Sequence, residues 1–159
     1  MNMKRILYIL AVAFSCMALS VSCQTKEEPG TDISGVWHLV DTEGLILDQE
    51  LDVDVYAVFN SGNFELYQRV GESAGRYWYY SGTYSTSGNV LTGRYSDGTR
   101  LGGVSGEGYS ISLDGSTLFL TSVFSGEVSE YELVEEVPSE IADSAVPPVK
   151  SADAPAPVL

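Results

Sequence analysis

The chain has 159 residues, a length that suits one compact domain with flanking segments. Its 22 acidic residues stand against 8 basic ones, which gives a formal net charge of −14. Because so acidic a surface repels the phosphates of nucleic acids, we expect no nucleic-acid partner. The two cysteines, Cys16 and Cys23, both precede the region that has the pattern of a domain, and this excludes a disulfide framework.

The N-terminal segment has the order of a secretory signal peptide. Residues 1–5 end in two cations, residues 6–19 are almost wholly apolar, and small residues follow up to Cys23. The apolar run is too short and ends too abruptly for a membrane-spanning helix. We therefore predict a signal peptide over residues 1–22. Its removal leaves 22 acidic and 6 basic residues, a net charge of −16.

The four residues that end at Cys23, Ser-Val-Ser-Cys, resemble the lipobox of bacterial lipoproteins. In that family, signal peptidase II cuts before the cysteine, and its sulfur is then acylated with chains such as palmitate. The resemblance implies that Cys23 carries a lipid anchor, which is stable when it holds two or three acyl chains. Cys16 is a competing site, but it lies inside the apolar run. A polar tether, predicted over residues 23–33, begins directly at Cys23. Plain secretion or an uncleaved anchor is the alternative.

Residues 24–28, Gln-Thr-Lys-Glu-Glu, resemble the short acidic export signal of lipoproteins in Bacteroidetes. This resemblance implies an outer-membrane lipoprotein that is exposed at the cell surface. The alternative is a solvated linker, with the protein at the periplasmic face of the outer membrane.

Residues 34–135 are predicted to form one all-β domain. β-Branched and aromatic residues alternate with polar ones, and turns that contain glycine recur throughout. The pattern predicts eight strands, at residues 35–41, 53–59, 63–70, 77–85, 90–96, 108–113, 117–124 and 127–134. Alternation places these large side chains on the inner face: Trp37, Leu39, Val55, Phe59, Phe64, Leu66, Trp78, Tyr80, Tyr84, Leu91, Tyr95, Tyr109, Ile111, Leu113, Leu118, Leu120, Tyr131 and Leu133.

The lengths of the links predict how the strands are arranged. Tight hairpin signals at residues 60–63, 87–89 and 114–116 join the second strand to the third, the fourth to the fifth and the sixth to the seventh. The alternate links are mostly longer, so one end is tightly closed and the other carries long loops. Closure also removes exposed edge strands. We therefore predict an eight-stranded antiparallel up-and-down β-barrel with no C-terminal helix, which has room for side chains or one small ligand.

Residues 136–159 are rich in alanine, proline, serine and acids and contain few large apolar residues. Such a composition cannot bury enough apolar surface to offset the entropy of ordering, so this tail is predicted to be disordered.

Gly35-Val36-Trp37 resembles the G-x-W signature of the calycins, the superfamily that includes lipocalins and avidins. This resemblance implies that Gly35 and Trp37 form a structural plug at the closed end of the barrel. More closely, residues 59–98, with Gly-Thr-Tyr-Ser and Gly-Asn-Val-Leu-Thr within them, look like the lipocalin-like domain of Bacteroidetes lipoproteins. Residues 90–95 also resemble an avidin strand. The later strands lack the tryptophans of the avidin pocket, so biotin is not expected as a ligand.

The open end of the predicted barrel is the candidate ligand site. Its predicted residues are Trp78, Tyr80, Tyr95 and Tyr109, with Arg69, Arg76 and Arg100 around them. An apolar patch at residues 45–47 could form a lid over the mouth or a short helix that covers the barrel. An aromatic pocket with a few basic residues would suit a small amphipathic anion. The alternative is a filled core with incidental charges at its rim.

The sequence gives little indication of catalytic or metal-binding chemistry. His38 is the only histidine, so a His-centred triad would have to use it, and it points outward if Trp37 points inward. Asp48, Glu50, Asp52 and Asp54 alternate and could bind a hard cation, but a solvated outer face is the default explanation. We therefore expect no enzyme, no resident metal and no cofactor.

The sequence thus favours a lipid-anchored envelope lipoprotein whose lipocalin-like barrel binds an unidentified small apolar or aromatic ligand. The alternative is an acidic protein-interaction or inhibitor domain that binds a basic protein partner, with association steered by charge.

Overall fold

The structure is a computed structural model that describes residues 29–43, 52–71, 75–103, 105–148 and 154–159. The predicted signal peptide, Cys16, Cys23, the acidic segment 24–28 and the apolar patch 45–47 lie outside the described residues. No helix in the described ranges is long and apolar enough to cross a membrane.

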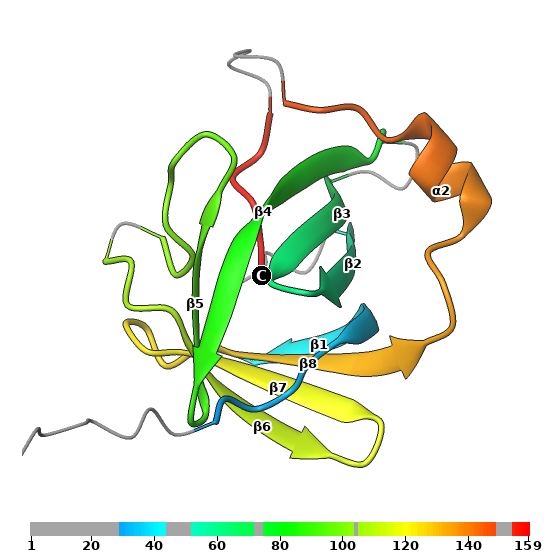
Figure 1. The fold of residues 1–159 in the computed structure, drawn as a ribbon. Helices are drawn as coiled ribbons and strands as arrows, with labels where there is room; N and C mark the ends of the chain where they lie inside the picture. Colours follow the sequence, from blue (N-terminus) through cyan, green and yellow to red (C-terminus); the bar gives the residue numbers. More distant parts are fainter. Residues whose placement is uncertain (1–28, 44–51, 72–74, 104, 149–153) are drawn as a thin grey trace, which may run out of the picture.

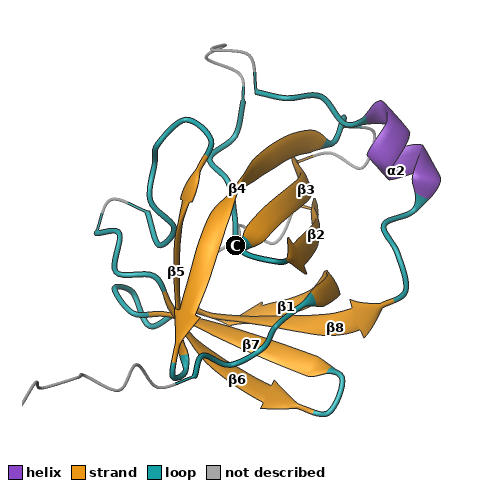
Figure 2. Ribbon diagram, viewed as in Figure 1, coloured by secondary structure: helices purple, strands orange, loops and turns teal. Residues whose placement is uncertain are grey.

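Eight strands form one closed antiparallel barrel, in which each strand pairs with its neighbour in sequence and β8 closes on β1 (Figures 1 and 2). The strands are β1 (Gly35–Glu43), β2 (Asp52–Asn60), β3 (Asn63–Gly71), β4 (Trp78–Ser87), β5 (Val90–Tyr95), β6 (Tyr109–Asp114), β7 (Thr117–Ser122) and β8 (Val128–Val134). The predicted eight-stranded antiparallel barrel is confirmed. Every strand end lies within two residues of its predicted position because period-two alternation and glycine turns are local signals.

The two ends of the barrel differ as the link lengths predict. The tight hairpins β2–β3, β4–β5 and β6–β7 lie at the closed end, and each has a glycine with positive φ. Trp37 is buried there, and its indole Nε1 donates to the Ile33 carbonyl at 2.9 Å. The segment before β1 crosses this end, where the Thr31 amide donates to the Gly88 carbonyl at 2.8 Å. The opposite end, at the start of β2, β4, β6 and β8, is called the mouth below.

The core lies inside the barrel. It contains Ile33, Trp37, Leu39, Val55, Ala57, Phe59, Phe64, Leu66, Tyr80, Leu91, Tyr95, Leu101, Ile111, Leu118, Leu120, Tyr131 and Leu159. Leu113 and Leu133 were predicted to be inward and pair with the inward residues Leu118 and Trp37. They are nevertheless 39% and 48% exposed, because they lie at the outer rim of the closed end.

The wall between β5 and β6 is completed by the link that joins them. The two strands share only two paired positions, Val90 with Ser110 and Leu91 with Tyr109, at the start of each strand. Beyond these, the link folds back beside β5, and the Leu101 amide donates to the Gly93 carbonyl at 3.0 Å. A Cβ on Gly93 would lie 2.4 Å from the Thr83 carbonyl oxygen and 2.7 Å from Leu101 Cδ1, so glycine is needed here. Leu101 is thus a core residue that lies outside the predicted strands.

The prediction of a disordered tail is wrong for its described residues, and so is the absence of a C-terminal helix. A short helix, α2 (Ser139–Ser144), follows β8 and buries Ile141. Val146 then pairs in parallel with Trp78, at the start of β4. Residues 154–159 run into the mouth (Figure 1, red). Composition misled the prediction, because a few apolar side chains dock while the barrel supplies hydrogen-bond partners.

The position of Gly82 predicts a test of the core. Gly82 lies between Phe64 and Tyr95 across neighbouring strands, and their rings meet over it at 5.2 Å between centroids. A Cβ there would lie 2.1 Å from the Arg94 carbonyl oxygen and 2.5 Å from the Phe64 ring. Gly82→Ala should therefore lower the free energy of unfolding by about 1–3 kcal/mol in urea titrations, through overpacking. The neighbouring exposed variant Thr83→Ala should change it by less than about 0.5 kcal/mol. Equal effects of the two variants would contradict this packing.

Candidate functional site

The structure brings together the four aromatic residues predicted for the mouth. Tyr80 and Tyr95 are buried, and their rings meet edge to face at 6.3 Å between centroids. Trp78 and Tyr109 are half-buried and pack against the same cluster. All four lie on the inner face, because they share register positions with inward residues of the adjacent strands. One wall of the mouth is therefore aromatic.

The prediction that Arg69 lines the mouth is wrong. Its guanidinium lies on the outer face, 3.2 Å from an Asp52 carboxylate oxygen and 3.5 Å from one of Asp54. It also stacks over the Tyr77 ring at 5.0 Å. Alternation explains the error, since the preceding residue, Gln68, points inward and the next must point outward.

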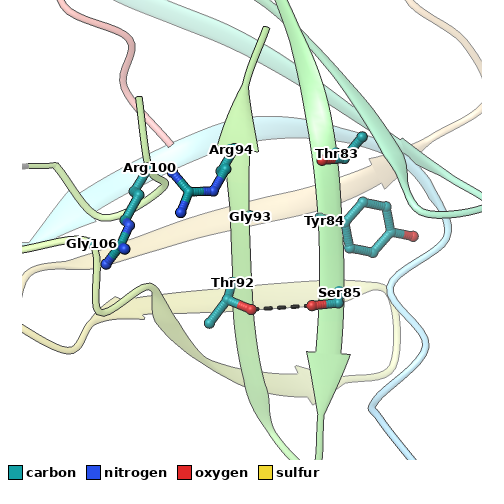
Figure 3. Close-up of a pocket in the computed structure, with 8 residues that line it drawn as sticks. All are labelled: Thr83, Tyr84, Ser85, Thr92, Gly93, Arg94, Arg100 and Gly106. Carbon is teal, nitrogen blue, oxygen red and sulfur yellow. Dashed lines mark hydrogen bonds between the residues drawn. The ribbon is translucent and has the colours of Figure 1, made fainter. Parts of the chain in front are cut away.

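Arg100 and Arg76 also differ from their predicted role. Arg100 lies in a groove of about 470 Å³ on the outer wall, beside Arg94 and against β5 (Figure 3). Arg100 reaches this groove because the β5–β6 link turns back along the strand. Arg76 is exposed, with its guanidinium 5.7 Å from the centre of the Trp78 ring. Of the three predicted arginines, Arg76 alone remains next to a mouth aromatic.

Gln68 is the functional candidate that the sequence reading missed. It is fully buried on the inner face of β3, and the described core holds just one other buried polar residue, Ser129. The signal was present, since the alternation of Phe64 and Leu66 continues to Gln68. A buried amide needs both a hydrogen-bond acceptor and a donor. The barrel wall therefore presents an unusual polar group to whatever fills the mouth.

Residues 154–159 supply the partners of this polar group. Gln68 Nε2 donates to the Ala156 carbonyl at 2.9 Å, and Gln68 Oε1 accepts from the Val158 amide at 2.7 Å. The Tyr80 hydroxyl donates to the Pro155 carbonyl at 2.5 Å. The Leu159 side chain is 4% exposed and belongs to the core. This segment, called the plug below, thus occupies the mouth.

Space remains beside the plug. A cavity of about 390 Å³ lies between the plug and the rim of the mouth. Its lining includes Tyr109, Phe124 and Ser129 from the barrel, with Pro157 and Leu159 from the plug. Phe124 is 73% exposed, which leaves a large apolar side chain at the entrance. The mouth is therefore an apolar depression with a few polar groups on its wall.

The tyrosines of the interior are neutral donors at physiological pH. Burial raises the pKa of Tyr95, Tyr109 and Tyr131, and also that of Tyr80, because the ionised phenolate would lose its hydration. The nearby phenols add to this effect for Tyr95 and Tyr131. The Tyr131 hydroxyl is buried with no hydrogen-bond partner among the described residues. The interior thus holds one phenol whose hydrogen-bonding capacity the described chain leaves unused.

A second cluster lies on the outer face and involves His38, which points outward as expected. His38 Nε2 lies 2.8 Å from Asp54 Oδ1, and its ring stacks on Tyr56 at 4.3 Å between centroids. The Tyr77 hydroxyl donates to the other Asp54 oxygen. Because Arg69 pairs with Asp52 and Asp54, these carboxylates are compensated by a cation. No group of three or more metal-ligating side chains occurs in the described ranges, and Asp48 and Glu50 lie outside them.

The raised pKa of Tyr95 predicts a loss of stability in alkali. A group whose pKa is higher in the folded state stabilises the fold fully below its unfolded pKa, about 10, and progressively less above it. The free energy of unfolding should therefore fall as pH rises from about 10 to 11.5. Tyr95→Phe should reduce that slope by up to about 1.4 kcal/mol per pH unit, measured by urea titration at each pH. Identical slopes in the two proteins would show that Tyr95 ionises without a folding penalty.

The comparisons with known proteins agree with this architecture. The family described as "Lipocalin-like domain" matches residues 33–120, from the segment before β1 into β7. The matched region contains Gly35, Trp37 and all four mouth aromatics. Neither the curated proteins nor the solved structures gave a match. Because more than half of the chain fits the family and the strands close into an eight-stranded barrel, this chain belongs to the lipocalin-like domain family.

Proposed function

We propose that this protein is a lipid-anchored envelope lipoprotein whose barrel binds a small apolar or aromatic ligand in its mouth. One observation carries the binding proposal. The mouth admits a six-residue segment, 154–159, and still leaves a cavity of about 390 Å³. A lumen packed only by its own wall residues would leave no room for that segment. Lipocalin-like barrels are in general suited to small ligands.

The lining of the mouth defines the ligand class. Small-molecule sites are mostly apolar, with a few polar groups that fix orientation. The aromatic wall supplies apolar contact, while Gln68 and Tyr80 supply two donors and one acceptor. Arg69 and Arg100 lie on the outer face, so an anion would find little positive charge inside. The lining therefore favours an elongated, mainly neutral ligand that carries a carbonyl or amide group.

The anchor proposal rests on the sequence around Cys23 and on where the barrel begins. The segment before β1 is bonded to the β4–β5 hairpin through Thr31 and Gly88, at the closed end. A lipid on Cys23 would therefore attach the barrel from its closed end. In this arrangement the mouth opens on the side opposite the point of attachment, where a ligand can enter from the surrounding medium.

Ligand binding is tested with N-phenyl-1-naphthylamine, a neutral dye that fluoresces in apolar sites, on the chain carrying Cys23→Ser. We expect saturable binding, and we expect Tyr109→Ala to weaken it roughly tenfold because Tyr109 lines the cavity. Tyr67→Ala, on the outer face of β3, is the matched control and should change the affinity less than about twofold.

Native mass spectrometry of the same protein, purified from its own host, extends this test to the natural ligand. A retained small-molecule adduct is expected. An adduct-free mass together with no saturable dye binding would contradict the proposal. It would favour the alternative of a basic protein partner, whose affinity should fall steeply with salt.

The anchor is tested by labelling cells with an alkyne analogue of palmitate. The unmodified chain should take up label and fractionate with the outer membrane, and Cys23→Ser should lose both properties. Cys16→Ser is the matched control and should keep both. If Cys23→Ser retained its label, Cys16 would be the acylated residue. External protease added to intact cells then distinguishes surface exposure from the periplasmic face.

A further inference from the structure

The barrel binds the plug mainly through the backbone of the plug. The Gln68 amide spans the Ala156 carbonyl and the Val158 amide, two groups that point to the same side of an extended chain. The Pro155 carbonyl is bound by Tyr80. These contacts require an extended peptide backbone but no particular side chain at position 156. Gln68 therefore makes the pair of backbone hydrogen bonds that a neighbouring β-strand would otherwise make.

The two prolines of the plug suit this recognition. Pro157 lies between the two residues that Gln68 binds, so its missing amide hydrogen costs no contact. Each proline fixes its own φ and restricts the residue before it to extended conformations. The sequence Ala-Pro-Ala-Pro-Val-Leu is therefore largely extended before it docks. A preorganised segment loses less conformational entropy on binding.

The plug lies in the same part of the mouth as the proposed ligand. Leu159 is buried in the core, and Pro157, Val158 and Leu159 line the remaining cavity. Nevertheless, no β-ladder holds the plug, since the described segment shares no strand pairing with the barrel. It also lies beyond the residues that match the family. Its attachment is thus limited to a few hydrogen bonds and one buried aliphatic side chain.

We propose that the mouth is a peptide-binding site for an extended, proline-containing segment, and that residues 154–159 occupy it as a plug that a small ligand displaces. The displacement part rests on the proposed function. The chain is fixed at β4 through Val146, so the plug stays near the mouth. Such tethering gives an effective concentration on the order of millimolar. A segment of weak intrinsic affinity can therefore remain seated and still be released.

The test compares Val158→Pro with Val158→Ala. Proline at 158 removes the amide hydrogen that bonds to Gln68 Oε1, whereas alanine keeps it. The readout is the Gln68 side-chain amide in a ¹H–¹⁵N NMR spectrum, assigned with Gln68→Leu. In the unmodified chain and in Val158→Ala, this resonance should exchange slowly with water. In Val158→Pro it should exchange at least tenfold faster, because the plug leaves.

An acetylated synthetic peptide of residues 154–159 provides the second measurement. It should bind Val158→Pro at least tenfold more tightly than the unmodified chain and restore the slow Gln68 exchange. The plug proposal would be overturned if Gln68 exchanged equally fast in the unmodified chain, Val158→Ala and Val158→Pro. It would also be overturned if the peptide bound the unmodified chain and Val158→Pro equally well. Urea midpoints establish that the variants are folded. If Val158→Pro is not folded, Leu159→Asp with Leu159→Met as its control makes the same comparison.

Dye binding separates the two proposals. Release of the plug in Val158→Pro should raise the affinity for N-phenyl-1-naphthylamine at least threefold, and the dye should speed Gln68 exchange in the unmodified chain. If the peptide binds but the dye binds neither protein, the peptide site stands and the small-ligand function fails. If the dye binds both proteins equally and leaves Gln68 exchange unchanged, the plug proposal fails and the small-ligand function stands.

Discussion

The pairing of β8 with β1 is the constraint on which the rest of this structure depends. In a closed barrel, alternate side chains along each strand face either the interior or the surroundings. The interior then has a fixed volume, which the side chains fill unevenly. At the closed end, Trp37, Phe59 and Phe64 pack fully. Toward the mouth, the wall residues leave room that another group must occupy.

The segment before β1, the closed end and the mouth are related by the same geometry. Even and odd links of a meander lie at opposite ends, so the tight hairpins and the entering segment share one end. The remaining links and the plug share the other. The outer-face network of His38, Asp54 and Arg69 ties β1, β2 and β3 together without reaching the interior. These charged groups therefore contribute to the wall and leave the mouth apolar.

Much of the fold could be predicted because its signals are local. Turn glycines and alternation set the strand ends, and the mouth aromatics followed from the same period. Arg69 was misplaced although that period assigns it correctly, since Leu66 inward implies Gln68 inward and Arg69 outward. Arg100 and Leu101 could not be placed, because the link that carries them turns back on β5. That contact joins residues whose pairing has no local sequence pattern.

The plug escaped prediction for a different reason. Composition measures whether a segment can form its own core, and residues 136–159 cannot. Docking requires only that a few residues of the segment fit a site that already exists. Here the site is a buried amide that needs partners and a lumen that needs filling, and an extended proline-containing segment provides both. Gln68 and residues 154–159 were therefore missed for the same reason. Each is bound to the other, and neither could be interpreted alone.

A plug of this kind lowers the apparent affinity of the barrel for a ligand. An empty mouth would expose aromatic surface and leave the Gln68 amide without a protein partner, and both are unfavourable. The plug removes these costs until a ligand replaces it. A ligand then binds only the open fraction of molecules, so a plug seated in roughly nine of ten would weaken the apparent affinity about tenfold. Selectivity follows from this competition, because a ligand must cover the aromatic wall and also satisfy the donors and acceptor that the plug gives up. A purely apolar molecule would meet the first requirement and fail the second.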